Sequence, residues 1–257
     1  MNIPIRLLVP AVAAAALLTA ACGSQEEPPA ERVFLGPPWT GDERYTYDLL
    51  ASGREPYGTC ILETDVESAP GVTTLSRLCS DEPGPHRDDG TAEVDGQTLE
   101  PLRSTRVQTD AEKNRRISFT ATYEYPIVKF QADENGKLRQ TERDLPQPTA
   151  SNPDPAYYDD ETMLWLVRGI ELRTGYQGTY RNVSAATGAV FDVKLRVEGE
   201  EEVTVPAGTF RTWKIRISTS TITQFAWVEA EAPHRVIKAR VHGLQDVDYV
   251  LSGSERP

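Results

Sequence analysis

The residues able to carry out enzymatic chemistry are few and scattered. Three histidines, His86, His234 and His242, stand in separate segments, and none lies beside a candidate nucleophile or a second metal ligand. The Gly-x-Ser-x-Gly elbow that presents a nucleophilic serine is also absent. The acidic run Asp159-Asp160-Glu161 has the residue types of paired catalytic carboxylates, but acids at a helix start are stabilised by the helix dipole, which explains them at lower cost. We therefore expect no enzyme activity, no metal site and no cofactor.

A second acidic stretch, HRDDGTAEVDG at residues 86–96, raises the question of calcium binding. It lacks the spacing of oxygen ligands found in calcium-binding loops. Aspartate and glycine are common in turns. The sequence therefore favours a turn here rather than a metal site.

Cys60 and Cys79 are spaced for a disulfide across a hairpin. The turn signal Ser-Ala-Pro-Gly lies midway between them, and antiparallel pairing in which residue numbers sum to 139 puts the two cysteines opposite each other. Opposite residues on antiparallel strands have Cα atoms about 4.5–5.5 Å apart, which suits a disulfide. Two free thiols or a metal pair are the alternatives, and the lack of a nearby histidine makes a poor zinc site.

The third cysteine, Cys22, ends an N-terminal segment that resembles a bacterial lipoprotein signal. A single charge, Arg6, precedes an apolar run of about 15 residues, shorter than the roughly 18–20 that a spanning helix needs. Leu18-Thr19-Ala20-Ala21-Cys22 resembles the lipobox, although Thr19 stands where an aliphatic residue is usual. The resemblance implies cleavage before Cys22, acylation, and anchoring to the extracytoplasmic face of a bacterial membrane. The alternative is an ordinary signal peptide with a chance cysteine.

Composition divides the rest of the chain into a tether and one domain. Residues 22–41 are rich in proline, glycine and charge, which predicts a flexible tether. The expected organisation is a signal at 1–21, the tether at 22–41, a single domain at 42–252 and a tail at 253–257. Lysine and arginine number 27 against 39 aspartates and glutamates, a net charge of −12. Nucleic acid repels such a chain, so we expect no nucleic-acid binding and membrane contact through lipid alone.

Alternation of apolar and polar residues dominates the domain. The clearest runs of alternate apolar positions are Ile117/Phe119/Ala121/Tyr123, Phe191/Val193/Leu195/Val197, Trp213/Ile215/Ile217 and Ile237/Ala239/Val241. This period of two predicts antiparallel strands with one dry face and one wet face. Turn signals fall at SAPG, DENGK, VEGEE, VPAGTF and EAPH. We expect about six strands, one helix and then five strands.

One segment breaks the alternation. Met163, Leu166, Val167 and Ile170 have helical spacing, and Asp159 is placed as the N-cap. A helix of about ten residues, ended by Gly169 or Gly175, is not stable alone and must pack on the sheet. The predicted fold is therefore mainly β: a single strongly curved antiparallel sheet, an incompletely closed barrel wrapped on one helix.

The stretch VTVPAGTFRTWKIRI, residues 203–217, predicts a hairpin corner. Pro206 suits a strand end, and Gly208 supplies the positive φ of a tight turn. The longer run GEEEVTVPAGTFRTWKI resembles the signature of a family of bacterial exported proteins of unknown function, with one acid more than expected at residues 201–202. The resemblance implies a curved half-barrel similar to the LolA-like lipoprotein carriers over residues 45–252. It implies no established activity.

The expected ligand site is aromatic. Trp213, Phe225 and Trp227 share one parity, which predicts that they face inward, while Met163 and Trp165 lie on the helix that should face them. A plain core is the commoner fate of such residues, but a curved sheet around a short helix leaves room for an apolar pocket. The leading hypothesis is a lipid-anchored binding or carrier module for an apolar or amphipathic ligand. The alternative is a structural lipoprotein with a filled core that contacts another envelope protein, and the oligomeric state is left open.

Overall fold

The computed structural model describes residues 32–51, 55–81, 83–149, 153–241 and 246–255. Cys22 and the expected signal lie outside the described residues. Within them the chain forms one fifteen-stranded sheet in the order β8-β7-β6-β5-β4-β3-β2-β1-β15-β14-β13-β12-β11-β10-β9. The pairing is antiparallel throughout except between β9 and β10. The first and last strands, β1 and β15, are neighbours, so a meander before the helix and a meander after it join into one sheet.

The strands differ widely in length. Those before the helix are β1 (Glu43–Ala51), β2 (Pro56–Ala69), β3 (Val72–Ser80), β4 (His86–Asp95), β5 (Pro101–Asp110), β6 (Arg115–Glu124), β7 (Ile127–Glu134), β8 (Lys137–Asp144) and β9 (Tyr158–Asp159). Those after it are β10 (Gln177–Ser184), β11 (Ala189–Val205), β12 (Gly208–Ser218), β13 (Thr223–Glu229), β14 (Val236–Val241) and β15 (Val247–Glu255). More strands precede the helix than the sequence predicts, because strands such as β8 are exposed on both faces and show no apolar period.

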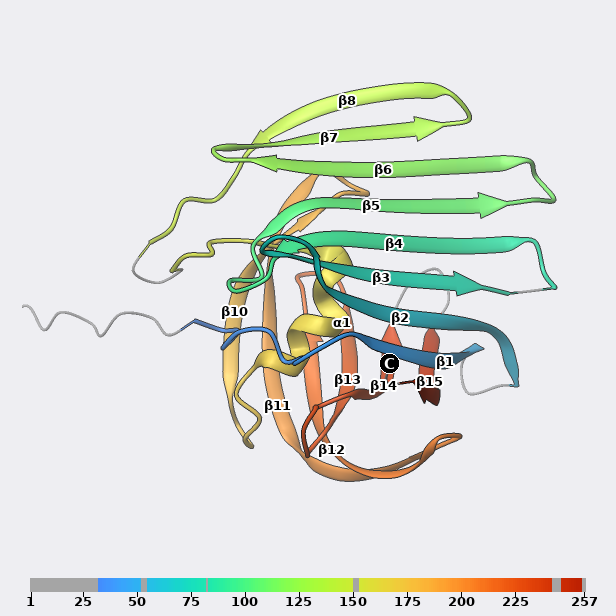
Figure 1. Cartoon of the computed structure of the whole chain (residues 1–257), viewed down its shortest axis with the longest axis vertical. Coiled ribbons are helices and arrows are strands. Elements are labelled where there is room, and N and C mark those ends of the chain that lie inside the picture. The colour runs from blue at the N-terminus through green and yellow to red at the C-terminus, as the bar shows by residue number, and fades with distance from the viewer. Residues whose placement is uncertain (1–31, 52–54, 82, 150–152, 242–245, 256–257) are drawn as a thin grey trace, which may run out of the picture.

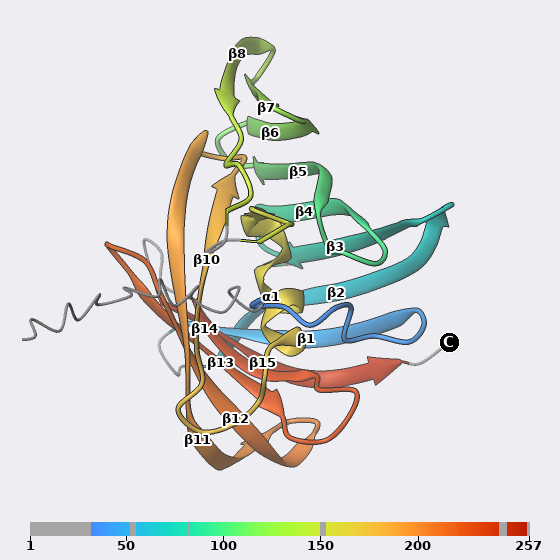
Figure 2. The same cartoon turned by 90° about the vertical axis from the view of Figure 1, so that its left-hand side faces the viewer.

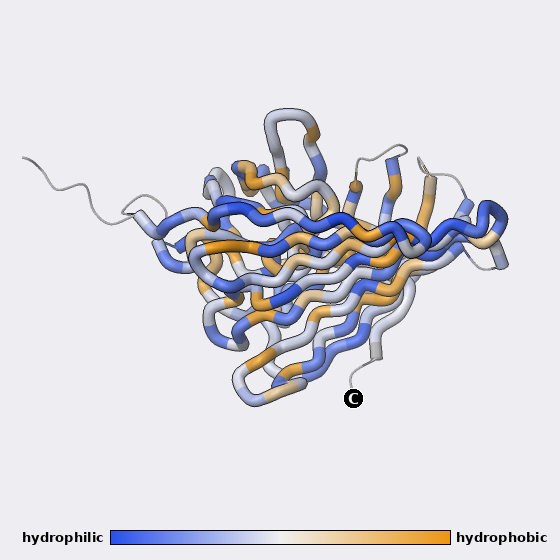
Figure 3. The backbone as a smooth tube through the Cα atoms, turned by 90° about the horizontal axis from the view of Figure 1, so that it is seen from above, coloured by the Kyte–Doolittle hydropathy of each residue, from blue (hydrophilic) through white to orange (hydrophobic). Residues whose placement is uncertain are grey.

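The sheet curls around the helical segment and does not close. Strands β10–β14 lie on one side of α1 and strands β1–β4 on the other, while β5–β8 extend beyond the helix (Figures 1 and 2). Strands β8 and β9 are the two ends of the sheet order, so no pairing completes a barrel. The predicted fold class, a single curved sheet wrapped on one helix, is confirmed. Figure 3 shows hydrophilic and hydrophobic residues alternating along the strands.

The helical segment is shorter and less regular than one α-helix. It consists of a 3-10 turn, η1 (Asp160–Thr162), one turn of α-helix, α1 (Met163–Leu166), and a second 3-10 turn, η2 (Val167–Gly169). The Asp159 side chain accepts a hydrogen bond from the Glu161 backbone N–H at 2.8 Å, so it caps the segment as its sequence position predicts. Gly169 is the last helical residue.

The interior between this segment and the sheet is filled by a hydrophobic core. Leu166, Val167, Leu75, Ile215 and Leu251 are all at most 1% exposed. A smaller core cluster joins β6 and β7 to β10 and the chain before β9, and includes Ala121, Val128, Phe130, Tyr157 and Val183. The outer part of the sheet is therefore held to the β10 side by a second set of contacts.

The turn signals at VPAGTF and VEGEE have different outcomes. Val205 pairs with Gly208 across a two-residue turn, and Gly208 has φ +135°, so the hairpin corner is as predicted. The VEGEE stretch is not a hairpin. Strand β11 runs through it with a register shift between Val197 and Gly199, because a glycine with positive φ allows a bulge in a continuous strand.

The end of the expected tether belongs to the domain. Phe34 and Trp39 are 3% and 6% exposed within the main core. The Leu35 backbone N–H donates to the Gly169 carbonyl at 2.8 Å, and the Tyr176 hydroxyl donates to the Val33 carbonyl at 3.2 Å. The proline- and glycine-rich composition predicted a flexible tether over 22–41, but the burial of Phe34 and Trp39 holds the end of this segment against the domain. Residues 33–41 therefore form a packed strap.

Candidate functional site

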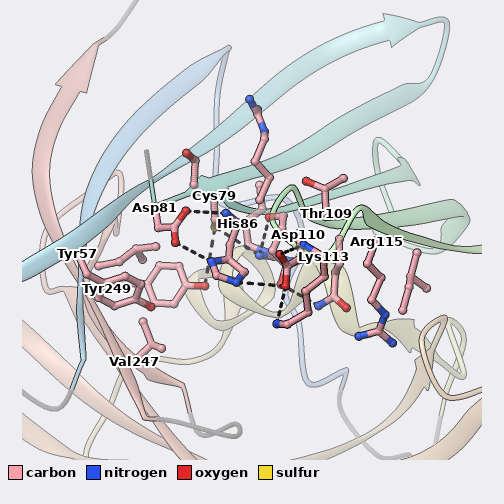
Figure 4. A pocket seen from close by; sticks show the side chains of 17 residues that line it. Tyr57, Cys79, Asp81, His86, Thr109, Asp110, Lys113, Arg115, Val247 and Tyr249 are labelled. Carbon is pink, nitrogen blue, oxygen red and sulfur yellow. Dashed lines mark hydrogen bonds and ion pairs between the residues drawn. The ribbon is translucent and has the colours of Figure 1, made fainter. Parts of the chain in front are cut away.

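A pocket of about 460 Å³ lies on the concave side of the sheet and has two unlike walls. One wall is apolar and aromatic, with Leu49 of β1, Tyr57 of β2, and Val247 and Tyr249 of β15. The other wall comes from β4, β5, the turn after β5 and the start of β6. Its polar residues are His86, Arg87, Asp88, Gln108, Thr109, Asp110, Lys113 and Arg115. Figure 4 shows Tyr57, Tyr249 and Val247 grouped on one side, across from Asp110, Lys113 and Arg115.

A ring of four alternating charges lies beneath the pocket. Arg77 Nη2 is 3.3 Å from Asp88 Oδ1 and 3.1 Å from Glu161 Oε2. Arg106 Nε and Nη2 donate to both oxygens of Asp88, at 2.8 and 2.5 Å, and Arg106 Nη1 is 3.8 Å from Glu161 Oε1. The ring joins β3, β4 and β5 to the start of the helical segment, and Arg77 and Asp88 also line the pocket.

The ring favours the ionised forms of Asp88 and Arg77. Burial opposes ionisation of Asp88, but the hydrogen bond from Arg106 and the charge of Arg77 outweigh burial and lower the pKa of Asp88 to about 2. Burial likewise favours neutral Arg77, yet the carboxylate of Glu161 raises the pKa of Arg77 above its usual value. The floor of the pocket is therefore a fixed arrangement of donors and acceptors with no net charge.

A second cluster of polar side chains, centred on His86, forms the rim of the pocket. The Nδ1 atom of His86 lies 2.8 Å from Asp81 Oδ2, and its Nε2 atom lies 3.5 Å from Asp110 Oδ2. Asp110 in turn accepts from Lys113 Nζ at 2.7 Å. The hydrogen bond to Asp81 raises the pKa of the exposed His86 imidazole. His86 is thus the first residue of a strand and part of a rim network, whereas the sequence indicated an isolated loop histidine.

A disulfide bond lies in the pocket wall between the charge ring and the polar cluster around His86. Cys60 and Cys79 are directly opposite each other, with an S–S distance of 2.05 Å and a Cα–Cα distance of 4.0 Å. The neighbouring pairs Leu62–Arg77 and Thr64–Leu75 also match the register expected from the sequence. Cys79 lines the pocket, and Arg77 Nη1 lies 3.4 Å from its Sγ. The cross-link therefore fixes β2 to β3 at the pocket.

The acidic run at the helix start is buried beside the pocket rather than in it. Asp159 is fully buried and accepts hydrogen bonds from the Ser104 and Tyr123 hydroxyls. Burial raises the pKa of Asp159 to about 6. Of the three acids only Glu161 reaches the ring under the pocket, whereas Asp159 attaches the start of the helical segment to Ser104 of β5 and Tyr123 of β6.

The helical residues expected to bind ligand belong to the core. Trp165 is 2% exposed, and its Nε1 donates to Thr64 Oγ1 at 3.0 Å. Met163 packs against the main core cluster. Neither residue lines either of the two pockets described here. The space between helix and sheet that the sequence left open for an apolar ligand is occupied by these side chains.

The prediction that Phe225 and Trp227 face inward with Trp213 is wrong. Trp213 pairs with Val228, whereas Trp227 pairs with Lys214 and Phe225 with Arg216. Opposite residues share a face, so the two aromatic rings lie on the convex side, where Lys214 Nζ sits 5.2 and 5.6 Å from their centroids. Four residues connect β12 to β13, so odd positions on one strand match even positions on the other.

Trp213 lines a second, more open pocket of about 560 Å³. The strap residues Leu35, Pro37 and Pro38 form one side of it, and the end of the helical segment forms another. Arg168 lines it as well, but its guanidinium is held by Glu43 at 2.8 Å and by the carbonyls of Pro233 and His234. Of the five residues that the sequence predicted to bind a ligand, this pocket contains only Trp213.

The residues that form the first pocket are not among those predicted from the sequence. Arg77 lies two residues before Cys79 on β3, so both side chains point to the inner face of the sheet. A charged arginine at an inward-facing position is the one sequence feature that could have indicated a polar site there. Asp88 lies within the acidic stretch interpreted as a turn, but this stretch forms β4 because it pairs on both sides, with β3 and with β5. Tyr57 and Tyr249 come from strands that lie far apart in the sequence, and no local pattern relates them.

The fold and pocket define a class: an open, β-barrel-like protein with a mixed apolar and polar pocket on its concave side. The chain belongs to the family described as "Protein of unknown function (DUF3108)", which matches residues 84–242. The expectation of a family of unknown function is thereby confirmed. No curated protein matches the sequence.

Two solved structures are similar to the chain. One is the beta-barrel-like protein of the domain of unknown function DUF1849 from Brucella abortus, with a TM-score of 0.52 and 12% identity over 84% of this chain and 97% of that chain. The other, from Bacteroides fragilis and described as having a YmcC-like fold, has a TM-score of 0.31 and 14% identity over 88% of this chain and 100% of that chain. The first supports the fold alone.

The described residues contain no group of three or more histidine, cysteine, aspartate or glutamate side chains arranged to hold a metal ion. In the same part of the chain no helix has the length and hydropathy needed to cross a bilayer.

Proposed function

We propose that this protein is a binding or carrier module of the cell envelope that holds an amphipathic ligand in the pocket between β1/β15 and β4–β6. The observation that carries the proposal is the pair of unlike walls. Leu49, Tyr57, Val247 and Tyr249 offer apolar surface, and the wall opposite offers hydrogen-bonding groups. A ligand with an apolar and a polar part matches both walls at once.

The size and support of the pocket agree with this proposal. Small-molecule sites measure about 300–1,000 Å³ and are usually preformed, and this one measures about 460 Å³. The disulfide and the charge ring fix its floor by linking β2, β3, β4, β5 and the helical segment. Binding would need little rearrangement of the backbone.

The location in the envelope rests on the N-terminal sequence and on the disulfide. The lipobox-like residues before Cys22 support a lipid anchor on the extracytoplasmic face of a bacterial membrane. A disulfide persists in oxidising compartments and is rare in the cytosol, which agrees with export.

The pairing of the acidic and basic side chains that line the pocket supports a non-enzymatic role. The acids and bases that line it are engaged with one another, as in the His86–Asp110–Lys113 and Arg77–Asp88–Arg106 groups. None of these contacts pairs a nucleophile with a base and an orienting group. The arrangement presents fixed dipoles to a ligand rather than a reacting group.

A second candidate function is a structural envelope protein without a ligand. The filled interior around Trp165 and Leu166 favours it, since the apolar space expected between helix and sheet is packed. The two candidates make different predictions for the concave pocket.

Matched tyrosine variants test the proposal. Tyr57 is 43% exposed in the pocket, and Tyr125, 57% exposed at the β6–β7 turn, lies outside it. Native mass spectrometry of the gently purified protein should show a retained small molecule, which Tyr57→Ala loses and Tyr125→Ala keeps. Protein without retained mass, together with no binding of decyl amphiphiles by calorimetry, would favour the structural candidate.

A further inference from the structure

We propose that the polar part of the ligand is uncharged and rich in hydroxyl groups, so that the pocket takes a glycoside-like amphiphile rather than an ionic one. This inference rests on the proposed function and specifies its ligand. It follows from the state of the charged residues that line the pocket.

Each charged side chain that lines the pocket already has a partner of opposite sign. At the floor, Arg77 and Asp88 belong to the four-membered ring with Arg106 and Glu161. At the rim, Asp81 and Asp110 both contact His86. The remaining pairs are Lys113 with Asp110 at 2.7 Å, Arg115 with Glu134 at 3.0 Å, and Arg87 with Asp89 at 3.5 Å.

An ionic head group would meet both signs of charge at once. A sulfate or carboxylate placed against Lys113 also approaches Asp110, and one placed against Arg77 also approaches Asp88. A cationic head group meets the reverse arrangement, because the same carboxylates hold the same cations. An ion bound at the floor would have to displace an existing pair, and breaking a buried pair is strongly unfavourable.

A hydroxyl group neither meets a like charge nor has to displace an ion pair. It donates and accepts, so it fits a wall that alternates carboxylate acceptors with guanidinium and amide donors. Carboxylates and guanidinium groups keep further hydrogen-bonding positions after forming one ion pair. Gln108, which donates to Asp88 at 3.2 Å, adds a neutral polar group to the same wall. Tyr57 and Tyr249 face this wall with aromatic surface suited to the apolar part of the ligand (Figure 4).

Amphiphiles that share one decyl chain and differ only in the head group test the inference. The probes are decyl maltoside, decyl sulfate and decyltrimethylammonium, each below its micelle concentration, titrated into the purified full chain by calorimetry. Decyl maltoside should bind at least about 10-fold more tightly than either ionic probe, a difference of about 1.4 kcal/mol. Its affinity should stay constant between low and high salt, because no ion pair forms on binding.

Two variants locate the effect. Gln108→Leu and, separately, Gln108→Ala should weaken decyl maltoside binding several-fold while leaving the ionic probes unchanged. Leu138→Ala on the exposed strand β8 is the control that should leave all three affinities as they are. The two variants remove the same amide but leave side chains of different size, so the test survives if one of them fails to fold.

The outcomes separate this inference from the proposed function. Tighter or equal binding of an ionic probe, or maltoside affinity that falls with salt, overturns the hydroxyl-rich head group while leaving an amphiphile site. Binding of none of the three probes overturns the proposed function as well. Selective binding of decyl maltoside that both Gln108→Leu and Gln108→Ala weaken supports both.

Discussion

The carboxylate of Glu161 lies where a side chain on Gly90 would be. A Cβ built on Gly90 overlaps Glu161 Oε2 and comes within 3.2 Å of Arg77 Nη2. Gly90 stands on the inner face of β4, opposite Arg77 of β3 and Arg106 of β5. The missing side chain thus makes room for an acid from a segment 71 positions later, and this contact joins the helical segment to the sheet under the pocket.

Replacing this glycine should break the ring. Gly90→Ala is expected to displace Glu161 and leave Arg77 without its closest anionic partner, lowering the free energy of unfolding by about 3 kcal/mol. Urea denaturation measures the change. Gly41→Ala is the matched control, since nothing lies within 4 Å of a Cβ there. Substitutions on a protein surface usually change stability by no more than about 0.5 kcal/mol. If Gly90→Ala changes the free energy of unfolding by no more than this, the contact between Gly90 and Glu161 is contradicted.

The disulfide should hold in the native protein and contribute to its stability. Cys60 and Cys79 are 19 residues apart, and closing a loop of this length is worth roughly 3 kcal/mol in the chain-entropy model. Alkylation after denaturation without reductant should label neither cysteine. The double variant Cys60→Ser/Cys79→Ser should unfold at lower urea concentration than wild type. Labelling of both thiols in unreduced protein is the contrary result.

Stability should fall as pH rises from about 4 to 6. Burial raises the pKa of Asp159 to about 6 and also raises that of Asp160. The folded state therefore binds protons that the unfolded chain, with an ordinary Asp pKa near 3.8, has released, and ionisation in this window lowers the free energy of unfolding. A shift of about two units corresponds to on the order of 3 kcal/mol. The measurement is urea unfolding at several pH values.

Asp159→Asn should flatten this slope, whatever its effect on overall stability. His86→Gln is the control: the pKa of His86 is raised above 6.5, so His86 affects the slope only above the window. The stability that His86 contributes is present below about pH 6.5 and is lost as pH rises through its folded pKa. A stability that increases between pH 4 and 6 would show that Asp159 is not a buried acid of raised pKa.

The two faces of the sheet should respond differently to loss of an aromatic ring. Trp165→Ala removes a core side chain and leaves Thr64 without its indole partner, at a cost of about 3–5 kcal/mol. Phe225→Ala removes contacts with Lys214 and Arg216 on the convex face, and exposed cation–π contacts are worth about 0.5–1 kcal/mol each. Thermal and urea unfolding compare the two variants. Equal losses would indicate that Phe225 faces the core after all.

The proposed anchor predicts an added mass and a location. The protein should fractionate with membranes and carry acyl chains on Cys22, since two or three chains give durable attachment. Cys22→Ala should abolish the acyl mass and release the protein or leave its signal uncleaved. A soluble wild-type protein whose first residue is not Cys22 would count against this.

Local pattern determined a large part of the fold. Alternation with one dry face predicted a one-sided antiparallel sheet, and such a sheet must curl to cover that face. The position of Asp159 before Met163 predicted the cap. The turn signal midway between Cys60 and Cys79 predicted their pairing, although the register shifts between Asp65 and Ala69 on the way from the turn to the cysteines. Pro206 and Gly208 predicted the hairpin at residues 205–208, since both restrict the backbone locally.

The pocket was decided by tertiary structure alone. Its apolar wall combines Tyr57 with Tyr249, and its polar wall comes from other strands, so no sequence window contains both. The parity of Trp227 depended on how many residues the β12–β13 loop uses, and one residue more or less moves a side chain to the other face. The position of Arg77 in the interior is possible only because Glu161 and Asp88 meet it there, which pairing of distant segments alone provides.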